Sequence, residues 1–308
     1  MAAIRDAHPQ ATITWVINPE WAPLLRGNRD VDHIHVFPRG DFQGLGAPGS
    51  FFSWLKRTRT LRPDLALDFQ GLLRSALIAK FSRARVIYGM SDAREGSRLF
   101  YDRVAKVERR AHAVERYLQL AEECGASVGE RLRCPFPTGD PLPRFDEDEP
   151  FVLLHPFARG GGKSLSNQVI EEFCSMLAPA RVILVGKSSR VLDLPGNCFQ
   201  LTNQTTLLQL IYLLRKAKFT VTTDSGPMHI AAAISGQLLS IHMRTDPRRV
   251  GPYNSDAWIW RGGQILRVDE LETVRRLKRG RRFRVSDLEQ ILPLVEDALG
   301  IESNAVHT

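Results

Sequence analysis

Two short stretches of the sequence carry residue types that could bind phosphate. The first, LLHPFARGGGKSLS at 153–166, is an apolar strand candidate that leads into three glycines, Lys163 and Ser164. Glycine-rich turns expose backbone N–H groups to an anion, and a lysine between a strand end and a helix start adds positive charge there. The stretch therefore predicts a phosphate-binding loop with Lys163 as its charged ligand.

The same stretch has the strand, turn and Gly-Lys-Ser of a P-loop NTPase. That motif also requires a glycine five residues ahead of the glycine that precedes the lysine. Phe157 occupies that position, after His155 and Pro156, and these side chains do not suit a tight phosphate cradle. We therefore disfavour a P-loop kinase and expect Lys163 to hold phosphate in another type of protein.

The second stretch, FTVTTDSGPMHIAAAISG at 219–236, predicts a strand that ends at Asp224, a turn and a helix with Pro227 in its first turn. The backbone N–H groups of Gly226, Met228 and His229 would be unpaired at the start of that helix, which favours an anion. Taken alone, the same pattern is also typical of a purely structural strand–turn–helix. In that reading His229 is a hydrogen-bonded, partly buried histidine.

Strand and helix patterns alternate along both halves of the chain. Apolar runs of strand length lie at 12–17, 33–37, 65–69 and 85–89, and again at 151–155, 181–186, 219–224 and 238–242. Helical patterns separate them at 50–61, 72–81, 112–125, 167–177, 205–216 and 227–235. The alternation predicts an α/β fold of two doubly wound, Rossmann-like domains, with a cleft between them where the carboxyl ends of the strands face each other.

A segment rich in proline and acidic residues divides the two halves. Residues 134–150 contain five prolines, which disfavour both helix and strand. We therefore expect an N-terminal domain over 1–140 and a C-terminal domain over 150–284. A last helix, over 285–300, is expected to cross back to the N-terminal domain.

Composition narrows the class of protein. The 308 residues are 43% hydrophobic and 25% charged, which suits folded domains with sizeable cores rather than disorder. No apolar run approaches the roughly 20 residues of a membrane span, and MAAIRDAHPQ lacks the apolar region of a signal peptide. A cytoplasmic protein is therefore expected. The four scattered cysteines form no CxxC pair and predict reduced thiols, not a zinc site or a disulfide framework: Cys124, Cys134, Cys174 and Cys198.

The net charge of +8 favours anionic partners, and much of the excess lies in RRLKRGRRFR at 275–284. A run of this kind is often a solvated loop. It could instead touch an anionic membrane or a phosphorylated substrate. Nucleic acid is the weakest candidate, since no recognised nucleic-acid module accompanies the run.

Taken together, HPFARGGGK and DSGPMHIAAA resemble the ADP-heptose:lipopolysaccharide heptosyltransferases of glycosyltransferase family 9. The ending GGGKSLS departs from the more usual Lys-x-Trp-Pro of that family at Leu165 and Ser166. Further segments are similar to the family over nearly the whole chain: LDFQGLLRSALIAK (67–80), AREGSRLFYDR (93–103), HAVERYLQL (112–120) and TDPRRVGPYN (245–254).

The resemblance implies the two-domain glycosyltransferase B fold and an inverting transfer of heptose that uses no metal and no cofactor. The donor would be ADP-heptose, and the acceptor a phosphorylated lipid A/Kdo-type molecule. The enzyme would work as a peripheral protein at the inner face of the cytoplasmic membrane, in the inner core of lipopolysaccharide. Nucleic acid is not among the implied partners.

The resemblance also assigns roles to residues. Lys163 and the helix start would hold the ADP diphosphate, and Asp224 would orient that turn or meet the donor sugar. Arg74 and Arg94 would meet the acidic sugars and phosphates of the acceptor, although a salt bridge is an equal alternative for each. The implied donor-binding residues are Lys163, Asp224, Ser225, Gly226, Pro227, Met228 and His229.

The catalytic base is the main departure from the family. Family members begin with a strand and a Gly-Asp loop whose aspartate is the proposed base, whereas AAIRDAHPQATITWVI follows Met1 and is similar to the end of the first helix and the second strand. We expect the central strand of the first domain and this base to be missing, through an upstream start or a truncation, and Asp6 is no substitute. Asp224 is the fallback base. The alternatives are a sugar-nucleotide-binding relative with impaired catalysis and a nucleotide-sugar epimerase on the same fold.

Overall fold

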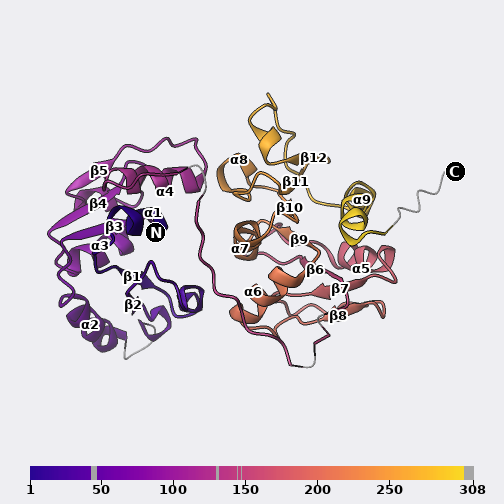
Figure 1. Ribbon diagram of the computed structural model, residues 1–308, viewed down its shortest axis with the longest axis horizontal. Helices are drawn as coiled ribbons and strands as arrows, with labels where there is room; N and C mark the ends of the chain where they lie inside the picture. Colours follow the sequence, from indigo (N-terminus) through magenta and orange to yellow (C-terminus); the bar gives the residue numbers. More distant parts are fainter. Residues whose placement is uncertain (43–46, 130–131, 144, 147, 302–308) are drawn as a thin grey trace. The chain divides into compact units, whose positions relative to one another are not determined.

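The computed structural model describes residues 1–42, 47–129, 132–143, 145–146 and 148–301. The chain divides into two compact units, Met1–Phe136 and Pro137–Thr308 (Figure 1). Both are built from parallel strands alternating with helices, as the sequence predicts. Within the described residues no helix is long and apolar enough to cross a membrane.

The second unit contains a seven-stranded sheet in the order β12-β11-β10-β9-β6-β7-β8. Its neighbouring strands are parallel except for β11 and β12, which form an antiparallel hairpin. The strands are β6 (Phe151–His155), β7 (Arg181–Leu184), β8 (Cys198–Gln200), β9 (Phe219–Thr223), β10 (Leu238–Ile241), β11 (Trp258–Arg261) and β12 (Gln264–Arg267). The helices are α5 (Asn167–Met176), α6 (Leu207–Lys216), α7 (Gly226–Ile234), α8 (Pro247–Val250) and α9 (Leu288–Leu299).

Local sequence signals explain the helix boundaries in this unit. The hydroxyl of Ser166 accepts from the backbone N–H of Val169 and begins α5. The hydroxyl of Thr206 caps α6 in the same way by accepting from the amide of Gln209. The side chain of Gln209 in turn accepts from the amide of Thr206. Every residue of β6, β7, β9 and β10 is buried, as expected for strands of a parallel sheet covered on both faces.

Helix α9 differs from the prediction. It was expected to cross back to the first half of the chain, but its apolar face packs into the core of the second unit. Leu288, Ile291 and Val295 are buried there with Val152 of β6. The spacing of these three residues produces one apolar stripe, and the fully buried sheet of its own unit supplies the surface to cover it.

The boundary between the units also lies earlier than expected, because the linker is bound to the second unit. The guanidinium of Arg181 lies 4.5 Å from the ring centroid of Phe145 and 4.7 Å from that of Phe199. It donates to the carbonyl oxygen of Asp146 at 2.8 Å. These contacts hold Phe145 and Asp146 of the linker against Arg181, at the amino end of β7.

The first unit contains two separate parallel sheets, β1-β2 and β3-β4-β5, with no ladder between them in the described residues. The strands are β1 (Thr14–Ile17), β2 (His33–Val36), β3 (Leu65–Asp68), β4 (Val86–Met90) and β5 (Arg103–Ala105). The helices are α1 (Ala2–Ala7), α2 (Ala47–Thr58), α3 (Leu73–Phe81) and α4 (Ala113–Glu122). Short 3-10 turns lie at Ala22–Leu25, Arg39–Phe42 and Ser97–Phe100, and in the second unit at Asp269–Leu271 and Val285–Asp287.

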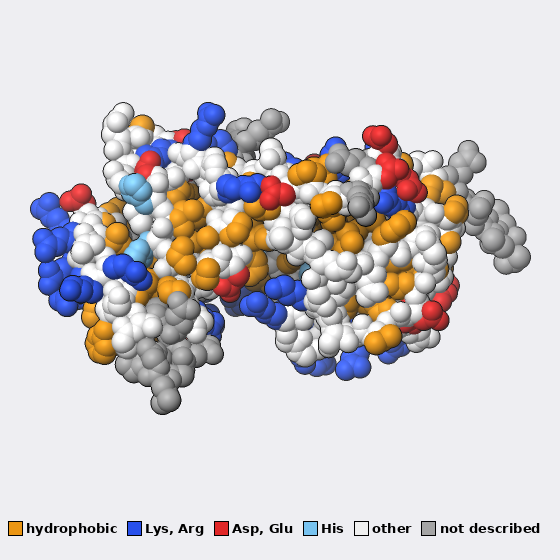
Figure 2. Space-filling model, turned by 90° about the horizontal axis from the view of Figure 1, so that it is seen from below, with side chains coloured by type: hydrophobic (Ala, Val, Ile, Leu, Met, Phe, Trp, Pro, Cys, Tyr) orange, Lys and Arg blue, Asp and Glu red, His pale blue; other side chains and the backbone are white. Residues whose placement is uncertain are grey.

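Strands of the first unit are more exposed than those of the second. Val16, Ile34 and Val36 on β1 and β2 each retain more than a third of their surface, at 37%, 42% and 39%. Figure 2 shows hydrophobic side chains gathered on the surface of this unit. Parallel strands are ordinarily covered on both faces, so this surface favours self-association.

Replacing Ile34 and Val36 together by threonine tests that conclusion. Threonine keeps the β-branch that suits a strand but reduces the apolar surface exposed to water. Binding of a hydrophobic dye and light scattering by self-associated protein should therefore both fall. The free energy of unfolding should change by less than about 1 kcal/mol, because both side chains are exposed. The control Val152→Thr, at a buried position, should instead destabilise the fold by about 1–3 kcal/mol. Unchanged scattering in the double variant would contradict the conclusion.

Candidate active site

The site follows from the order of strands in the second unit. The chain passes from β6 to β7 and β8 on one side, then returns to place β9, β10 and β11 on the other. Strands β6 and β9 are therefore neighbours whose connections leave in opposite directions. In open α/β sheets, ligands bind in the crevice beyond the carboxyl ends of such a strand pair.

The glycine-rich loop after β6 is closed at its base and open at its tip. The amide of Leu165 donates to the carbonyl oxygen of Pro156 at 3.0 Å, and the hydroxyl of Ser164 accepts from the amide of Ala158 at 3.0 Å. Gly160 and Gly162 have φ of +95° and +75°, a backbone region that side chains other than glycine rarely adopt. The loop therefore keeps its glycine backbone accessible to a ligand.

A contact from the next loop holds the tip of this loop. Arg244, which follows β10, donates from Nη1 to the carbonyl oxygen of Gly161 at 2.7 Å. Arg244 was not among the residues predicted from the sequence. Its cationic side chain lies beside the glycines and adds positive charge to the loop.

The geometry differs from that of a P-loop. Helix α5 begins only after its cap Ser166, three residues past Lys163, and the Ser164 hydroxyl is used to close the loop. In a P-loop the serine that follows the lysine holds a metal ion and opens the helix. This arrangement agrees with the absence of a glycine at position 157.

Lys163 and Asp224 meet across the strand pair. The Lys163 Nζ lies 2.7 Å from Asp224 Oδ2, and their side chains are 30% and 11% exposed. Burial raises the pKa of the Asp224 carboxyl, but hydrogen bonds from Lys163 and Thr245 outweigh it and leave the pKa below its usual value. Asp224 is therefore ionised at neutral pH, and Lys163 remains partly exposed beside it.

Two buried histidines lie beside the same strand ends, and neither was predicted from the sequence. His155 ends β6, and its Nδ1 lies 3.4 Å from the hydroxyl of Ser225. His242 follows β10, with Nδ1 3.0 Å from the Thr245 hydroxyl and Nε2 3.0 Å from the Ser240 hydroxyl. Burial lowers the pKa of each to about 4, so both are neutral and act as hydrogen-bonding supports. A histidine directly after an apolar strand was the available signal.

The start of helix α7 is only partly the open anion site that was expected. Ser225 is the N-cap residue, and its side chain makes no capping bond, while Gly226 and Pro227 form the first turn. The amide of Met228 donates to the carbonyl oxygen of Ser225 at 3.2 Å, and its side chain is fully buried. The expectation of an unpaired Met228 amide is therefore wrong. His229 lies exposed in the same turn.

The two arginines expected to bind acceptor lie in the first unit, at the carboxyl ends of strands. Arg74 is in the first turn of α3, after β3, with its guanidinium 5.7 Å from the ring centroid of Phe37. Arg94 is exposed after β4, and its amide donates to the carbonyl oxygen of Gly71 at 2.8 Å. The described residues give neither arginine an ion pair, so both guanidinium groups are available to an anion.

The turn between β3 and α3, just before Arg74, is organised by a buried carboxylate. Asp68 Oδ1 accepts from the amides of Gln70 and Gly71 at 3.0 and 3.1 Å. Its Oδ2 accepts from the Tyr101 hydroxyl at 2.7 Å and from the Ser75 hydroxyl at 2.9 Å. With every lone-pair direction occupied, Asp68 shapes the loop and is not a candidate base.

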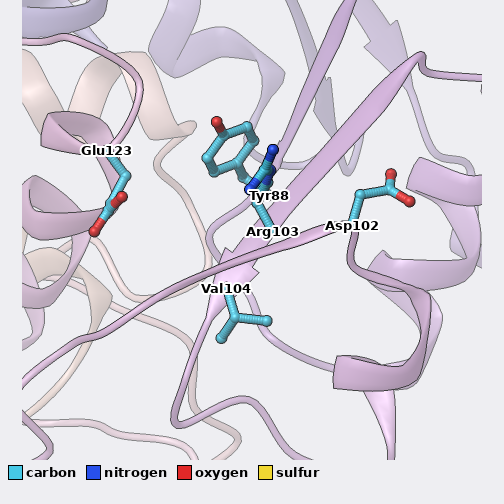
Figure 3. A pocket seen from close by; sticks show the side chains of 5 residues that line it. All are labelled: Tyr88, Asp102, Arg103, Val104 and Glu123. Atoms are coloured by element: carbon cyan, nitrogen blue, oxygen red, sulfur yellow. The ribbon is translucent and has the colours of Figure 1, made fainter.

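A hollow of about 430 Å³ in the first unit lies elsewhere (Figure 3). Arg103 is the first residue of β5, and Glu123 follows the last residue of α4, the helix that comes after β5. Both therefore lie at the amino ends of the parallel strands. Ligands of such sheets bind at the opposite edge. The hollow is therefore separate from the predicted acceptor residues. Its lining is Tyr88, Asp102, Arg103, Val104 and Glu123.

Comparison with known proteins identifies the family. The family model described as "Glycosyltransferase family 9 (heptosyltransferase)" matches residues 52–279. The chain belongs to this family. It is a glycosyltransferase, as the motifs of the two loops predict.

The similarity to individual proteins is lower. The chain is 21% identical over 272 residues to the lipopolysaccharide core heptosyltransferase OpsX of Haemophilus influenzae, a match that covers 82% of this chain and 76% of that one. It is 26% identical over 221 residues to lipopolysaccharide heptosyltransferase 1 of Escherichia coli, covering 64% of this chain and 66% of that relative, just under two thirds.

A solved structure matches the fold along nearly the whole chain. The E. coli heptosyltransferase WaaC with ADP matches with a TM-score of 0.71 at 20% identity, over 96% of this chain and 93% of that one. The α/β fold of the glycosyltransferase B type is thereby confirmed.

The buried histidines predict a pH dependence of stability. The pKa of His155 and His242 is about 4 in the folded protein, against the ordinary histidine value of 6.5, so unfolding takes up protons between these values. Stability should therefore be complete above about pH 6.5 and fall by up to about 1.4 kcal/mol per pH unit for each histidine as the pH drops toward 4. Urea unfolding between pH 7 and 5 measures this slope.

The variant His242→Gln should lose roughly half of that slope, whatever its effect on stability at pH 7. Equal slopes in wild type and His242→Gln would mean that His242 is not neutral in the folded protein.

Proposed function

We propose that this glycosyltransferase transfers heptose from ADP-heptose to the inner core of lipopolysaccharide, inverting the anomeric centre without a metal ion. The main support is the Lys163–Asp224 pair beyond the carboxyl ends of β6 and β9, where a partly exposed cation lies beside the glycine-rich loop. The family's description and the names of the relatives supply the sugar and the acceptor as candidates.

The donor would bind by exchange at Lys163. Its ammonium would leave Asp224 for an oxygen of the ADP diphosphate, beside the exposed glycine backbone. The Ser225–His229 turn at the start of α7 would face the same diphosphate, with Gly226 and Pro227 allowing close approach. As the sugar–phosphate bond breaks, negative charge grows on the departing ADP, and Lys163 and the helix start stabilise it.

Asp224 would orient the donor and not act as the base. Its lowered pKa makes it a weak proton acceptor, and Thr245 and Lys163 both donate to it. The Asp224 oxygen released by Lys163 would be suited to a sugar hydroxyl of the donor. Among the described residues Asp224 remains the first acid to test as a base, since Asp68 is fully hydrogen-bonded.

The acceptor would bind the first unit through its cations. Arg74 and Arg94 lie at the carboxyl ends of β3 and β4, and their guanidinium groups match the phosphates of a lipid A/Kdo-type acceptor. Such an acceptor is anchored in a membrane, so the enzyme would act as a peripheral protein at the inner face of the cytoplasmic membrane.

Lys163→Ala should weaken ADP binding by roughly ten- to a hundredfold, the equivalent of one charge-assisted contact of about 1.5–3 kcal/mol. Isothermal calorimetry without magnesium measures this. The matched control is Lys218→Ala, because Lys218 is an exposed lysine just before the amino end of β9. Unchanged ADP affinity in Lys163→Ala would remove Lys163 from the donor site.

Transfer itself is tested with ADP-heptose and a heptose-free lipopolysaccharide acceptor in the presence of a metal chelator. We expect a product with the inverted anomeric configuration and, in Asp224→Asn, a smaller loss of rate that accompanies weaker donor binding, as the orienting role requires. A rate about 10²–10⁴-fold lower with donor binding intact would instead make this carboxylate the base. ADP binding without transfer would indicate a binding-only relative, and conversion of the donor without acceptor would indicate an epimerase.

A further inference from the structure

The basic segment, residues 275–284, is a dense display of positive charge. Its sequence RRLKRGRRFR contains seven cationic residues and no acidic residue. One of the seven, Arg281, is paired with Asp287 while 37% of its side chain stays exposed. The other six are exposed: Arg275, Arg276, Lys278, Arg279, Arg282 and Arg284.

Contacts of Arg281, Phe283 and Gly280 fix the backbone of the segment. Arg281 donates from both terminal nitrogens to the buried carboxylate of Asp287, at 2.7 and 2.6 Å, and its guanidinium lies 5.0 Å from the ring centroid of Trp260. Phe283 is buried in the core. A Cβ on Gly280 would lie 2.3 Å from the carbonyl oxygen of Met243, so the chain passes against the β10 end with no room for a side chain.

The segment is also joined to the candidate active site. Arg261 of β11 donates from Nε to the carbonyl oxygen of Lys278 at 3.0 Å, and from Nη1 to the carbonyl oxygen of Thr245. Thr245 in turn bonds Asp224 and His242. One side chain therefore connects the basic segment to the loop that supports the Lys163–Asp224 pair.

A flexible charge run would spread its like charges apart in water, whereas the backbone of this one is held at Lys278, Arg281 and Phe283, and its six exposed cations lie within ten residues of chain. That arrangement fits a polyanionic surface. The segment has no exposed aromatic ring on which bases could stack, because Phe283 is buried, so single-stranded nucleic acid is less well matched. Anionic lipid headgroups need only closely spaced cations near the surface.

We infer that the basic segment docks on the anionic surface of a lipid membrane and so holds the donor site at that surface. The inference rests on the proposed function, in which the acceptor is a membrane lipid. It names the contact surface in the second unit, apart from the acceptor-binding arginines of the first.

The test uses the full chain and vesicles of phosphatidylcholine, with or without roughly one third phosphatidylglycerol, in a sedimentation assay at physiological salt. Wild type should bind the anionic vesicles, release them as salt rises, and ignore the neutral ones. The quadruple variant Arg275→Gln, Arg276→Gln, Arg279→Gln and Arg282→Gln should bind roughly 600-fold more weakly, at about fivefold for each of the four cations.

A matched variant controls for total charge. Arg57→Gln, Arg59→Gln, Arg83→Gln and Arg85→Gln remove four exposed cations from the first unit and should lower vesicle affinity far less. An equal loss in both variants would overturn the proposal in favour of net charge. Loss of RNA-fragment binding with intact vesicle binding in the first variant would overturn it in favour of nucleic acid.

A separate assay tests the proposed function by measuring heptose transfer to a water-soluble, delipidated acceptor. The basic-segment variant should keep that transfer, which also shows that it is folded. Transfer with wild-type vesicle binding in this variant would sink the docking proposal alone. Vesicle binding that depends on the segment, without any transfer by wild type, would sink the proposed function and leave the docking proposal standing.

Discussion

The parallel pairing of β6 with β9 is the constraint on which the site depends. These strands are separated by more than 60 residues of chain, yet they are neighbours at the middle of the sheet. Both strands are buried on each face, so charged side chains are placed beyond their carboxyl ends. His155 is the last residue of β6, Asp224 directly follows β9, and Lys163 lies in the loop after β6. The ion pair between Lys163 and Asp224 is therefore a product of sheet topology, and a shift in strand order would separate its partners.

The surrounding polar groups keep that pair in place at low cost. A half-buried carboxylate is costly unless it is hydrogen-bonded, and Thr245 and Lys163 meet this requirement for Asp224. His242 holds Thr245 through one ring nitrogen and Ser240 through the other, and remains neutral because it is buried. Asp224 thus has two donors, Thr245 and Lys163, and its charge does not rest on the lysine alone.

Much of the second unit was predictable because its strands are continuous apolar runs. The run 151–155 coincides with β6, and 219–224 overshoots β9 by its final aspartate. The hairpin of β11 and β12 was missed, although Gly262 and Gly263, with φ of +61° and +81°, mark its turn. The packing of α9 was mispredicted because an apolar stripe defines a buried face without naming the surface that covers it. His155 and His242 were missed because their function appears only when three strand ends are brought together.

The two units show how the same alternation of strands and helices can produce different degrees of burial. In the second unit, helices cover both faces of one sheet, and β6 loses all contact with water. In the first unit the strands form two sheets, which α1 bridges on one side by packing Ile4 against Ile13 and Leu67. The edges of β1 and β3 are then free of ladder partners in the described chain, and apolar side chains of β1 and β2 remain exposed. The Lys163–Asp224 pair and the residues that hydrogen-bond it all follow strands of the second unit, so its geometry does not depend on how completely the first unit's sheet is formed.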